Sequence, residues 1–255
     1  MSSAKQSSTW DLQLRQLLLP KLDHKASECE DAIAVDTQTF RFAVADGATE
    51  SFDARNWAER LAQHWVQRKS TLTVEEFRDW VATEGRELHD SWTGLTLSWY
   101  SEEKARYGSF ATLVGVELDL NTESPSWQAI ALGDACLLHF RNKTLLKSLP
   151  LSGSEGFNSG PVLVASDSSL HESSMQSVVT DSGTFQDGDV LLLMSDAASL
   201  WCLQRFETGD LDVSEFLSAK SDEELREFFD AERLAGRIRN DDLAIVRIEI
   251  KRSKS

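Results

Sequence analysis

The sequence predicts a fold that mixes antiparallel β-strands with amphipathic α-helices. Residues 32–35 and 40–45 are two short apolar runs separated by one turn, which is typical of an antiparallel pair. The polar turn 121–126 separates two longer apolar runs, 113–120 and 127–132, and this spacing predicts a hairpin. Residues 53–68 instead carry apolar side chains at the spacing of one helix face.

Further strands are expected at residues 136–141, 162–165, 190–194 and 243–250. Apolar and charged residues alternate in the last of these, so that strand is expected to have one solvated face. Residues 10–19 are rich in apolar side chains and stop at Pro20, and both a helix and a strand remain open there.

Two further helices are indicated by capping boxes, in which a Ser or Thr is followed three residues later by Glu. These begin at Thr73 and at Ser221. Other helices are expected over residues 95–106 and 198–206. Trp92 and Trp99 are interpreted as core residues, since a tryptophan beside a helix more often packs inside than stacks on a ligand.

The composition indicates a soluble protein of one domain, spanning residues 1–255, because no linker appears. The net charge of −16 argues against nucleic acid or an anionic membrane as the main partner, since phosphate groups would be repelled. The three cysteines are widely spaced, which fits a reducing cytoplasm. No stretch approaches the roughly 18 apolar residues of a membrane span, and the N-terminus lacks a signal-peptide core.

Acidic residues recur where strands begin or end. They are Asp31, Asp46, Asp196 and Asp241, with Asp134 at a further corner. Pairing of the first two strands would also bring Glu30 and Asp31 close to Asp46. Oxygen ligands without His or Cys suit hard cations such as Mg²⁺ or Mn²⁺, and two such ions about 3.5–4 Å apart activate water toward a phosphoryl group. The alternative, that these residues merely end strands on different sheet edges, remains open at this point.

Other hydrolytic or nucleotide-binding sites fit the sequence less well. The five His residues form no HExxH or other ligand spacing, which disfavours a zinc hydrolase. There is also no GxSxG, P-loop or GxGxxG motif.

The order of the acidic motifs along the chain resembles the metal-dependent phosphatase 2C (PPM-type) family. The matching motifs are Glu30-Asp31-Ala32, Val44-Ala45-Asp46-Gly47, Gly108-Ser109-Phe110-Ala111-Thr112, Gly133-Asp134, Leu193-Met194-Ser195-Asp196 and Asn240-Asp241-Asp242. They cover about residues 20–250, and the segment 45–51 looks most similar to a bacterial branch of the family. The resemblance implies an α+β fold: a four-layer α/β/β/α sandwich of two antiparallel sheets flanked by helices.

The resemblance also implies a metal centre and a reaction. Asp46 would bridge two Mn²⁺ or Mg²⁺ ions, with Asp196 and Asp241 on the first and the carbonyl of Gly47 on the second. Glu30 and Asp31 would hold metal-bound waters, and Asp134 with Asp196 would hold a weaker third ion. Metal-bound hydroxide would attack the phosphoserine or phosphothreonine of a protein substrate directly. Asp46, Asp196 and Asp241 would therefore be catalytic, and a serine/threonine kinase would be the functional counterpart.

Several positions depart from the family pattern. Ala48 leaves no general acid after the Asp-Gly pair, Ala197 replaces a usual glycine, and Ala135 replaces a usual serine. Ala26 stands where an arginine would clamp the substrate phosphate, so Lys21 and Lys25 are the predicted substrate-binding residues. Lysine supplies a point charge without the bidentate fork of arginine.

Three functions remain in competition. The leading prediction is an active Mn²⁺- or Mg²⁺-dependent serine/threonine protein phosphatase, since acids occupy every direct metal-ligand position. The missing arginine supports an inert phosphatase-like domain that binds a phosphoprotein or another partner. A metal-dependent hydrolase of small phosphoesters is the third.

Overall fold

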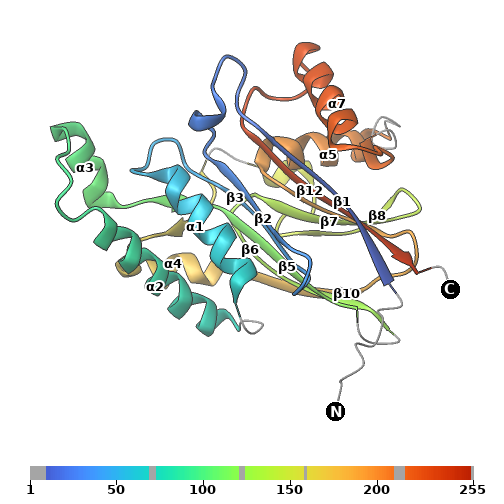
Figure 1. Cartoon of the computed structure of the whole chain (residues 1–255), viewed down its shortest axis with the longest axis horizontal. Coiled ribbons are helices and arrows are strands. Elements are labelled where there is room, and N and C mark those ends of the chain that lie inside the picture. The colour runs from blue at the N-terminus through green and yellow to red at the C-terminus, as the bar shows by residue number, and fades with distance from the viewer. Residues whose placement is uncertain (1–9, 69–72, 121–123, 158–159, 210–215, 254–255) are drawn as a thin grey trace.

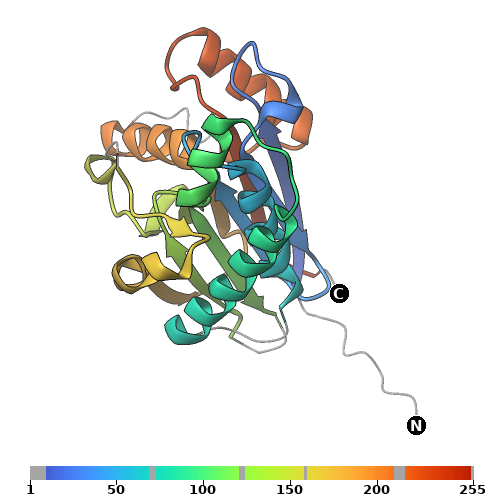
Figure 2. The same cartoon turned by 90° about the vertical axis from the view of Figure 1, so that its left-hand side faces the viewer.

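The structure, a computed structural model, describes residues 10–68, 73–120, 124–157, 160–209 and 216–253. Two five-stranded antiparallel sheets face each other, and helices cover the outer face of each (Figure 1). A view turned by 90° shows α1 (Ala54–Gln67) and α2 (Val74–Ser91), in cyan and teal, in front of the strands (Figure 2). Three buried hydrophobic clusters separate the four layers. The predicted four-layer α/β/β/α sandwich of the α+β class is therefore confirmed.

The first sheet has the strand order β1-β12-β11-β7-β8. These strands are β1 (Trp10–Leu19), β12 (Leu243–Arg252), β11 (Val190–Met194), β7 (Cys136–Arg141) and β8 (Thr144–Leu149). Its outer face is covered by α5 (Asp196–Thr208) and α7 (Asp222–Leu234), which bury Trp201 and Phe229 against the strands. The apolar run at residues 10–19 is thus a strand, paired along its whole length with β12.

The second sheet has the strand order β10-β6-β5-β3-β2. These strands are β10 (Val179–Thr184), β6 (Ser126–Leu132), β5 (Leu113–Asp119), β3 (Arg41–Asp46) and β2 (Asp31–Asp36). Its outer face is covered by α1 (Ala54–Gln67) and α2 (Val74–Ser91), whose apolar stripes bury Trp57, Leu61 and Phe77. The antiparallel pair β2–β3 and the hairpin β5–β6 are confirmed, although residues 121–123 of its turn lie outside the described residues.

Short elements complete the described chain. They are α3 (Trp99–Tyr107), α4 (His171–Ser174), the pair β4 (Phe110–Ala111) and β9 (Val164–Ala165), and the 3₁₀ turns η1 (Ala26–Glu28), η2 (Ser154–Gly156), η3 (Ser168–Leu170) and η4 (Met175–Ser177). Among the described residues, no helix combines the length and apolar character needed to cross a membrane.

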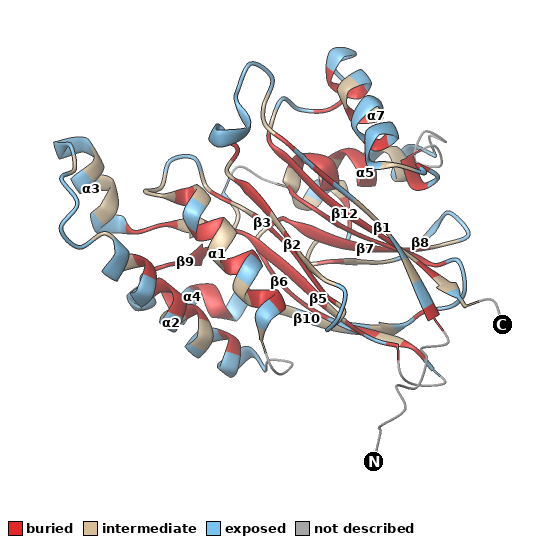
Figure 3. Ribbon diagram, viewed as in Figure 1, coloured by how far each residue is buried: buried red, intermediate tan, exposed pale blue. Residues whose placement is uncertain are grey.

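Burial follows the layers: the central strands of both sheets are mostly buried, whereas the edge strands β1, β8 and β10 and much of the helices and turns are half-buried or exposed (Figure 3). This pattern contradicts the expected solvated face of the strand at 243–250. Strand β12 lies between β1 and β11, with the second sheet on one side and helices on the other, so both of its faces are covered. Its buried Arg247 donates to the carbonyl of Leu217 and pairs with Glu249, which satisfies the charge.

The prediction that Trp99 packs in the core is wrong. Trp99 is 77% exposed on α3, a helix with no buried residue, which starts later than the expected position 95. Trp92 follows α2 and is half-buried, where its ring packs against Phe52 and its Nε1 donates to Asp53 at 2.9 Å. A tryptophan in a short polar helix therefore gives no reliable signal of burial.

Candidate metal centre

Ends of strands from both sheets surround one cavity of about 340 Å³. Five carboxylates and two cationic side chains line it: Asp46, Asp134, Asp196, Asp241, Asp242, Lys21 and Arg239. The two sheets thus bring together acids that are up to 196 positions apart in the sequence, from Asp46 to Asp242. The alternative that these strand-end acids lie on different sheet edges is excluded.

The register of β2 and β3 places Asp31 directly opposite Asp46. Cross-strand partners lie on the same face about 4.5–5.5 Å apart, so two like charges are forced into proximity. Asp31 is 3% exposed, and its Oδ2 atom has no hydrogen-bond partner among the described atoms. Burial, followed by the charge of Asp242, raises the pKa of Asp31 well above its ordinary value, against a hydrogen bond from Ser195. Enclosure and the neighbouring charge of Asp31 raise the pKa of Asp46 in the same way.

Asp196 stands where β11 ends and α5 begins. Reciprocal hydrogen bonds hold this corner: the Ser195 N–H donates to the Ala244 carbonyl, and the Ala244 N–H donates to Ser195 Oγ, both at 3.0 Å. The carboxylate of Asp196 accepts from the Ala197 N–H at the helix N-terminus, where the helix dipole favours a negative charge. Burial nevertheless raises the pKa of Asp196, while the Arg239 guanidinium opposes the shift.

Asp134 occupies the corner between β6 and β7 and is 7% exposed. Its burial, followed by the charge of Asp196, raises the pKa of Asp134 to about 6. A buried carboxylate beside another one is costly, and a bound cation would relieve that cost.

Gly47 and Thr112 fix the backbone at the end of β3. The Thr112 N–H donates to the Asp46 carbonyl at 2.8 Å, and Thr112 Oγ1 accepts from the Asp46 N–H at 3.1 Å. A side chain at Gly47 would place Cβ 2.8 Å from the Ala54 carbonyl oxygen and 2.9 Å from that of Glu30. Only glycine allows this close approach of three backbone segments beside the cavity.

Asp242 holds the segment from Lys21 to Glu30 beside the site. It belongs to the motif Asn240-Asp241-Asp242, but we assigned it no role from the sequence. It is 4% exposed, and its two oxygens accept the N–H groups of Lys21 at 2.8 Å and Glu30 at 2.9 Å. The second of two successive acids before a buried strand is the sequence signal for such a role. Asp242 therefore positions the segment that carries Lys21 and Glu30, while Asp241 faces the cavity.

The predicted rim residues form a polar chain around the opening. Glu30 accepts a hydrogen bond from Thr49 Oγ1 at 2.5 Å, and Lys21 Nζ donates to the same hydroxyl at 3.3 Å. Lys21 Nζ also lies 3.2 Å from Asp241 Oδ1. Lys25, the other predicted substrate-binding residue, is exposed near η1 and does not line the cavity.

Arg239 is a cavity residue that the sequence analysis missed. Its Nη2 pairs with Asp196 and lies 3.2 Å from Asp241 Oδ2. A lone arginine in a polar loop carries no spacing signal, so only the folded structure places it here.

The donor set fits a hard divalent cation in its chemical type. The acids offer only oxygen ligands, Asp31 Oδ2 is an orphaned buried acceptor, and burial followed by mutual repulsion raises the pKa values of Asp46 and Asp134. However, no three Asp, Glu, His or Cys side chains of the described chain converge on a common point as a ready-made ligand group. The ion pairs of Arg239 and Lys21 set the present orientation of Asp196 and Asp241, so a cation would compete with them for the same oxygens.

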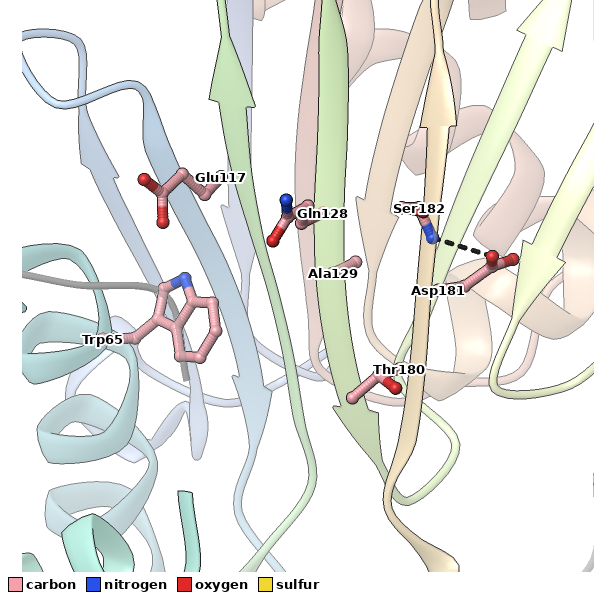
Figure 4. A pocket seen from close by; sticks show the side chains of 7 residues that line it. All are labelled: Trp65, Glu117, Gln128, Ala129, Thr180, Asp181 and Ser182. Carbon is pink, nitrogen blue, oxygen red and sulfur yellow. Dashed lines mark hydrogen bonds between the residues drawn. The ribbon is translucent and has the colours of Figure 1, made fainter. Parts of the chain in front are cut away.

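A separate cavity of similar volume lies on the second sheet (Figure 4). Trp65, Glu117 and Gln128 line it, and Glu117 pairs with Arg41 at the far end of β3. Arg41 is five positions from Asp46 along this strand, or about 17 Å. This groove is therefore not part of the carboxylate site.

Solved structures share this architecture. The photosystem II phosphatase PBCP superposes with a TM-score of 0.62 at 16% identity, over 95% of this chain and 100% of that chain. The catalytic domain of the serine/threonine phosphatase PstP, in complex with two manganese ions, gives 0.63 at 14% identity, over 95% and 100%. The Mycobacterium tuberculosis PstP gives 0.63 at 14% identity, over 94% and 99%.

Sequence comparison alone finds none of this. No protein-family model matches the sequence, and no curated protein matches it significantly. At identities below one fifth, the structural likeness establishes the fold, which is the one expected from the order of the acidic motifs. The chain has the phosphatase 2C fold.

Proposed function

We propose that this protein is a Mn²⁺- or Mg²⁺-dependent phosphatase that hydrolyses phosphoserine and phosphothreonine in proteins. The observation that carries the proposal is that five carboxylates line one cavity at the strand ends of both sheets. The proposal is also supported by the shared fold of PstP, a serine/threonine phosphatase whose catalytic domain was solved with two manganese ions.

In this proposal Asp46, Asp196 and Asp241 would hold two cations together with the carbonyl of Gly47. Glu30 and Asp31 would orient water at those cations, and Asp134 with Asp196 would offer a weaker third position. Bound Mn²⁺ or Mg²⁺ would lower the pKa of water and stabilise the negative charge that develops on the phosphoryl group.

The fold and its hydrogen bonds fix the positions of the side chains at the site. The β2–β3 register fixes Asp31 against Asp46, and the hydrogen bonds of Ser195 fix the start of α5 at Asp196. Lys21 is held by Asp242 and Thr49, and in this proposal its positive charge would attract an entering phosphate. Rigid placement of this kind accounts for much of the rate enhancement in phosphoryl transfer.

The test is hydrolysis of p-nitrophenyl phosphate with EDTA and with added Mn²⁺, for the wild-type protein and for Asp46→Asn. We expect turnover that depends on Mn²⁺ and falls by at least about a hundredfold in the variant. Asp11→Asn, at an exposed position on β1, makes the same chemical change away from the cavity and is the matched control. Turnover without Mn²⁺ dependence, or full activity of Asp46→Asn, would refute the proposal.

A second candidate is an inert domain that binds a phosphorylated partner. The ion pairs of Arg239 and Lys21 with Asp196 and Asp241 favour it, because they satisfy these acids without a cation. Folded protein that binds a phosphoserine peptide but hydrolyses neither the peptide nor p-nitrophenyl phosphate would establish this function.

The protein substrate, a counteracting serine/threonine kinase and a cytoplasmic location belong to the same proposal. The three cysteines are buried and unpaired, which supports a reducing compartment. Comparing kcat/KM for a phosphoserine peptide and for small phosphoesters distinguishes a protein phosphatase from a hydrolase of small molecules.

A further inference from the structure

Arg239 lies inside the cavity and contacts two of the proposed cation ligands at once. Its Nη2 pairs with Asp196 at the start of α5 and lies 3.2 Å from Asp241 Oδ2 before β12. The side chain lines the cavity and is 51% exposed, so part of it is open to solvent. Within the described part of the chain, no other arginine lines this cavity.

A divalent cation and Arg239 require the same oxygen atoms. Two positive groups cannot share Asp196 and Asp241 closely, so binding of a cation to these carboxylates would displace the guanidinium. The displaced group would stay nearby, because Arg239 is only two residues from Asp241 in the sequence. An anion bound beside the cations would then be the nearest group with which the displaced guanidinium could pair.

The shape of the side chain favours a phosphate as that anion. The guanidinium presents parallel N–H donors that match two phosphate oxygens, whereas the ammonium of a lysine offers a point charge. Lys21 also pairs with Asp241, but its Nζ donates to Thr49 and its backbone N–H donates to Asp242, and these two contacts remain when a cation takes Asp241. Lys25 does not line the cavity. Arg239 is therefore the side chain with both the geometry and the freedom to hold a phosphate there.

We propose that Arg239 changes partner: it pairs with Asp196 and Asp241 in cation-free protein and binds the substrate phosphate when divalent cations take these carboxylates. The inference rests on the proposed function for its substrate. It assigns the phosphate-binding role to a residue outside the acidic motifs, in a chain that has Ala26 at the expected arginine position.

Calorimetric titration tests both halves of this inference without measuring turnover. Mn²⁺ is titrated into EDTA-treated, dialysed protein, and inorganic phosphate is then titrated into the Mn²⁺-saturated protein. For Arg239→Gln we expect Mn²⁺ to bind at least about fivefold more tightly, because no internal cation competes. We expect phosphate to bind about 10- to 100-fold more weakly, the loss of a hydrogen-bonded charge pair.

Two further variants separate the effect of the guanidinium shape from the effect of net charge. Arg239→Lys keeps the charge but loses the fork, so phosphate affinity should fall between the wild type and Arg239→Gln. Arg226→Gln, at an exposed position on α7, changes the net charge equally and should alter neither titration. Unfolding curves confirm that each variant is folded.

The outcomes separate this inference from the proposed function. Unchanged phosphate affinity in Arg239→Gln, or weaker Mn²⁺ binding, overturns the partner change. Wild-type protein that binds no Mn²⁺ overturns it as well. If the wild type binds Mn²⁺ and phosphate as described but hydrolyses no phosphoester, the proposed function fails and the role of Arg239 in phosphate binding stands.

Discussion

Replacing Asp134 with asparagine should stabilise the cation-free protein, and the gain should depend on pH. Asp134 is 7% exposed at the corner between β6 and β7, and burial followed by the charge of Asp196 raises its pKa to about 6. The ionised form is thus unfavourable in the folded state. Asparagine has nearly the same shape and carries no charge, so it removes this penalty.

The magnitude follows from the pKa values. The difference between 3.8 for an ordinary Asp and about 6 in the folded protein corresponds to about 3 kcal/mol. Between these two values the folded protein binds more protons than the unfolded chain, so wild-type stability falls as pH rises through this window. The gain from Asp134→Asn should therefore be near zero at pH about 4 and reach about 2–3 kcal/mol at pH about 7.5.

Urea unfolding in EDTA, followed by tryptophan fluorescence at both pH values, measures this gain. Asp11→Asn is the control. Because the Asp11 carboxylate is exposed, this substitution should change the free energy of unfolding by a similarly small amount at both pH values. Added Mn²⁺ should reduce the advantage of Asp134→Asn, since a bound cation stabilises the wild-type carboxylates. An equal gain at both pH values, or no gain at pH about 7.5, would refute the reasoning about buried charge.

Three other substitutions test separate features by urea unfolding. Gly47→Ala should cost about 1–3 kcal/mol and abolish Mn²⁺-dependent turnover, because the new methyl group meets backbone carbonyls at 2.8–2.9 Å; wild-type stability would contradict this. Asp189→Ala should cost about 3–5 kcal/mol, since it leaves Arg141 and His139 without their fully buried partner; a loss below 1 kcal/mol would show that the pair is weak. Trp99→Ala should change the unfolding free energy by less than about 0.5 kcal/mol, as the ring is 77% exposed, and a larger loss would mean that α3 packs more closely than described.

The individual strands and helices were largely predictable because buried strands and amphipathic helices impose strong sequence periods, whereas the four layers were expected only from the resemblance of the acidic motifs to the phosphatase 2C family. Strands β8 and β10 were not predicted: both lie at sheet edges, and β10 carries the mostly polar sequence Val179–Thr184. The solvated face expected for β12 was wrong because periodicity describes a strand by itself. Whether its charged face meets water or a helix depends on the layer that packs against it.

The same distinction applies to the site. Acids at strand ends were visible in the sequence because the sheets fix where strands end, and the structure brings Asp46, Asp134, Asp196 and Asp241 into one cavity. Arg239 and Lys25 show the limit of this reasoning. Both are cationic residues outside regular strands, and only the path of the folded chain places one in the cavity and the other outside it.

The position of β12 determines when the site can form during synthesis. This strand follows all the other described strands in the chain, yet it lies between β1 and β11 in the first sheet. Until β12 emerges from the ribosome, β1 lacks the strand that neighbours it among the described strands, and Asp241 and Asp242 are not yet positioned beside the earlier acids. The nascent chain should therefore leave β1 without its neighbouring strand until β12 has emerged, and shortening the chain before residue 243 should yield aggregated protein.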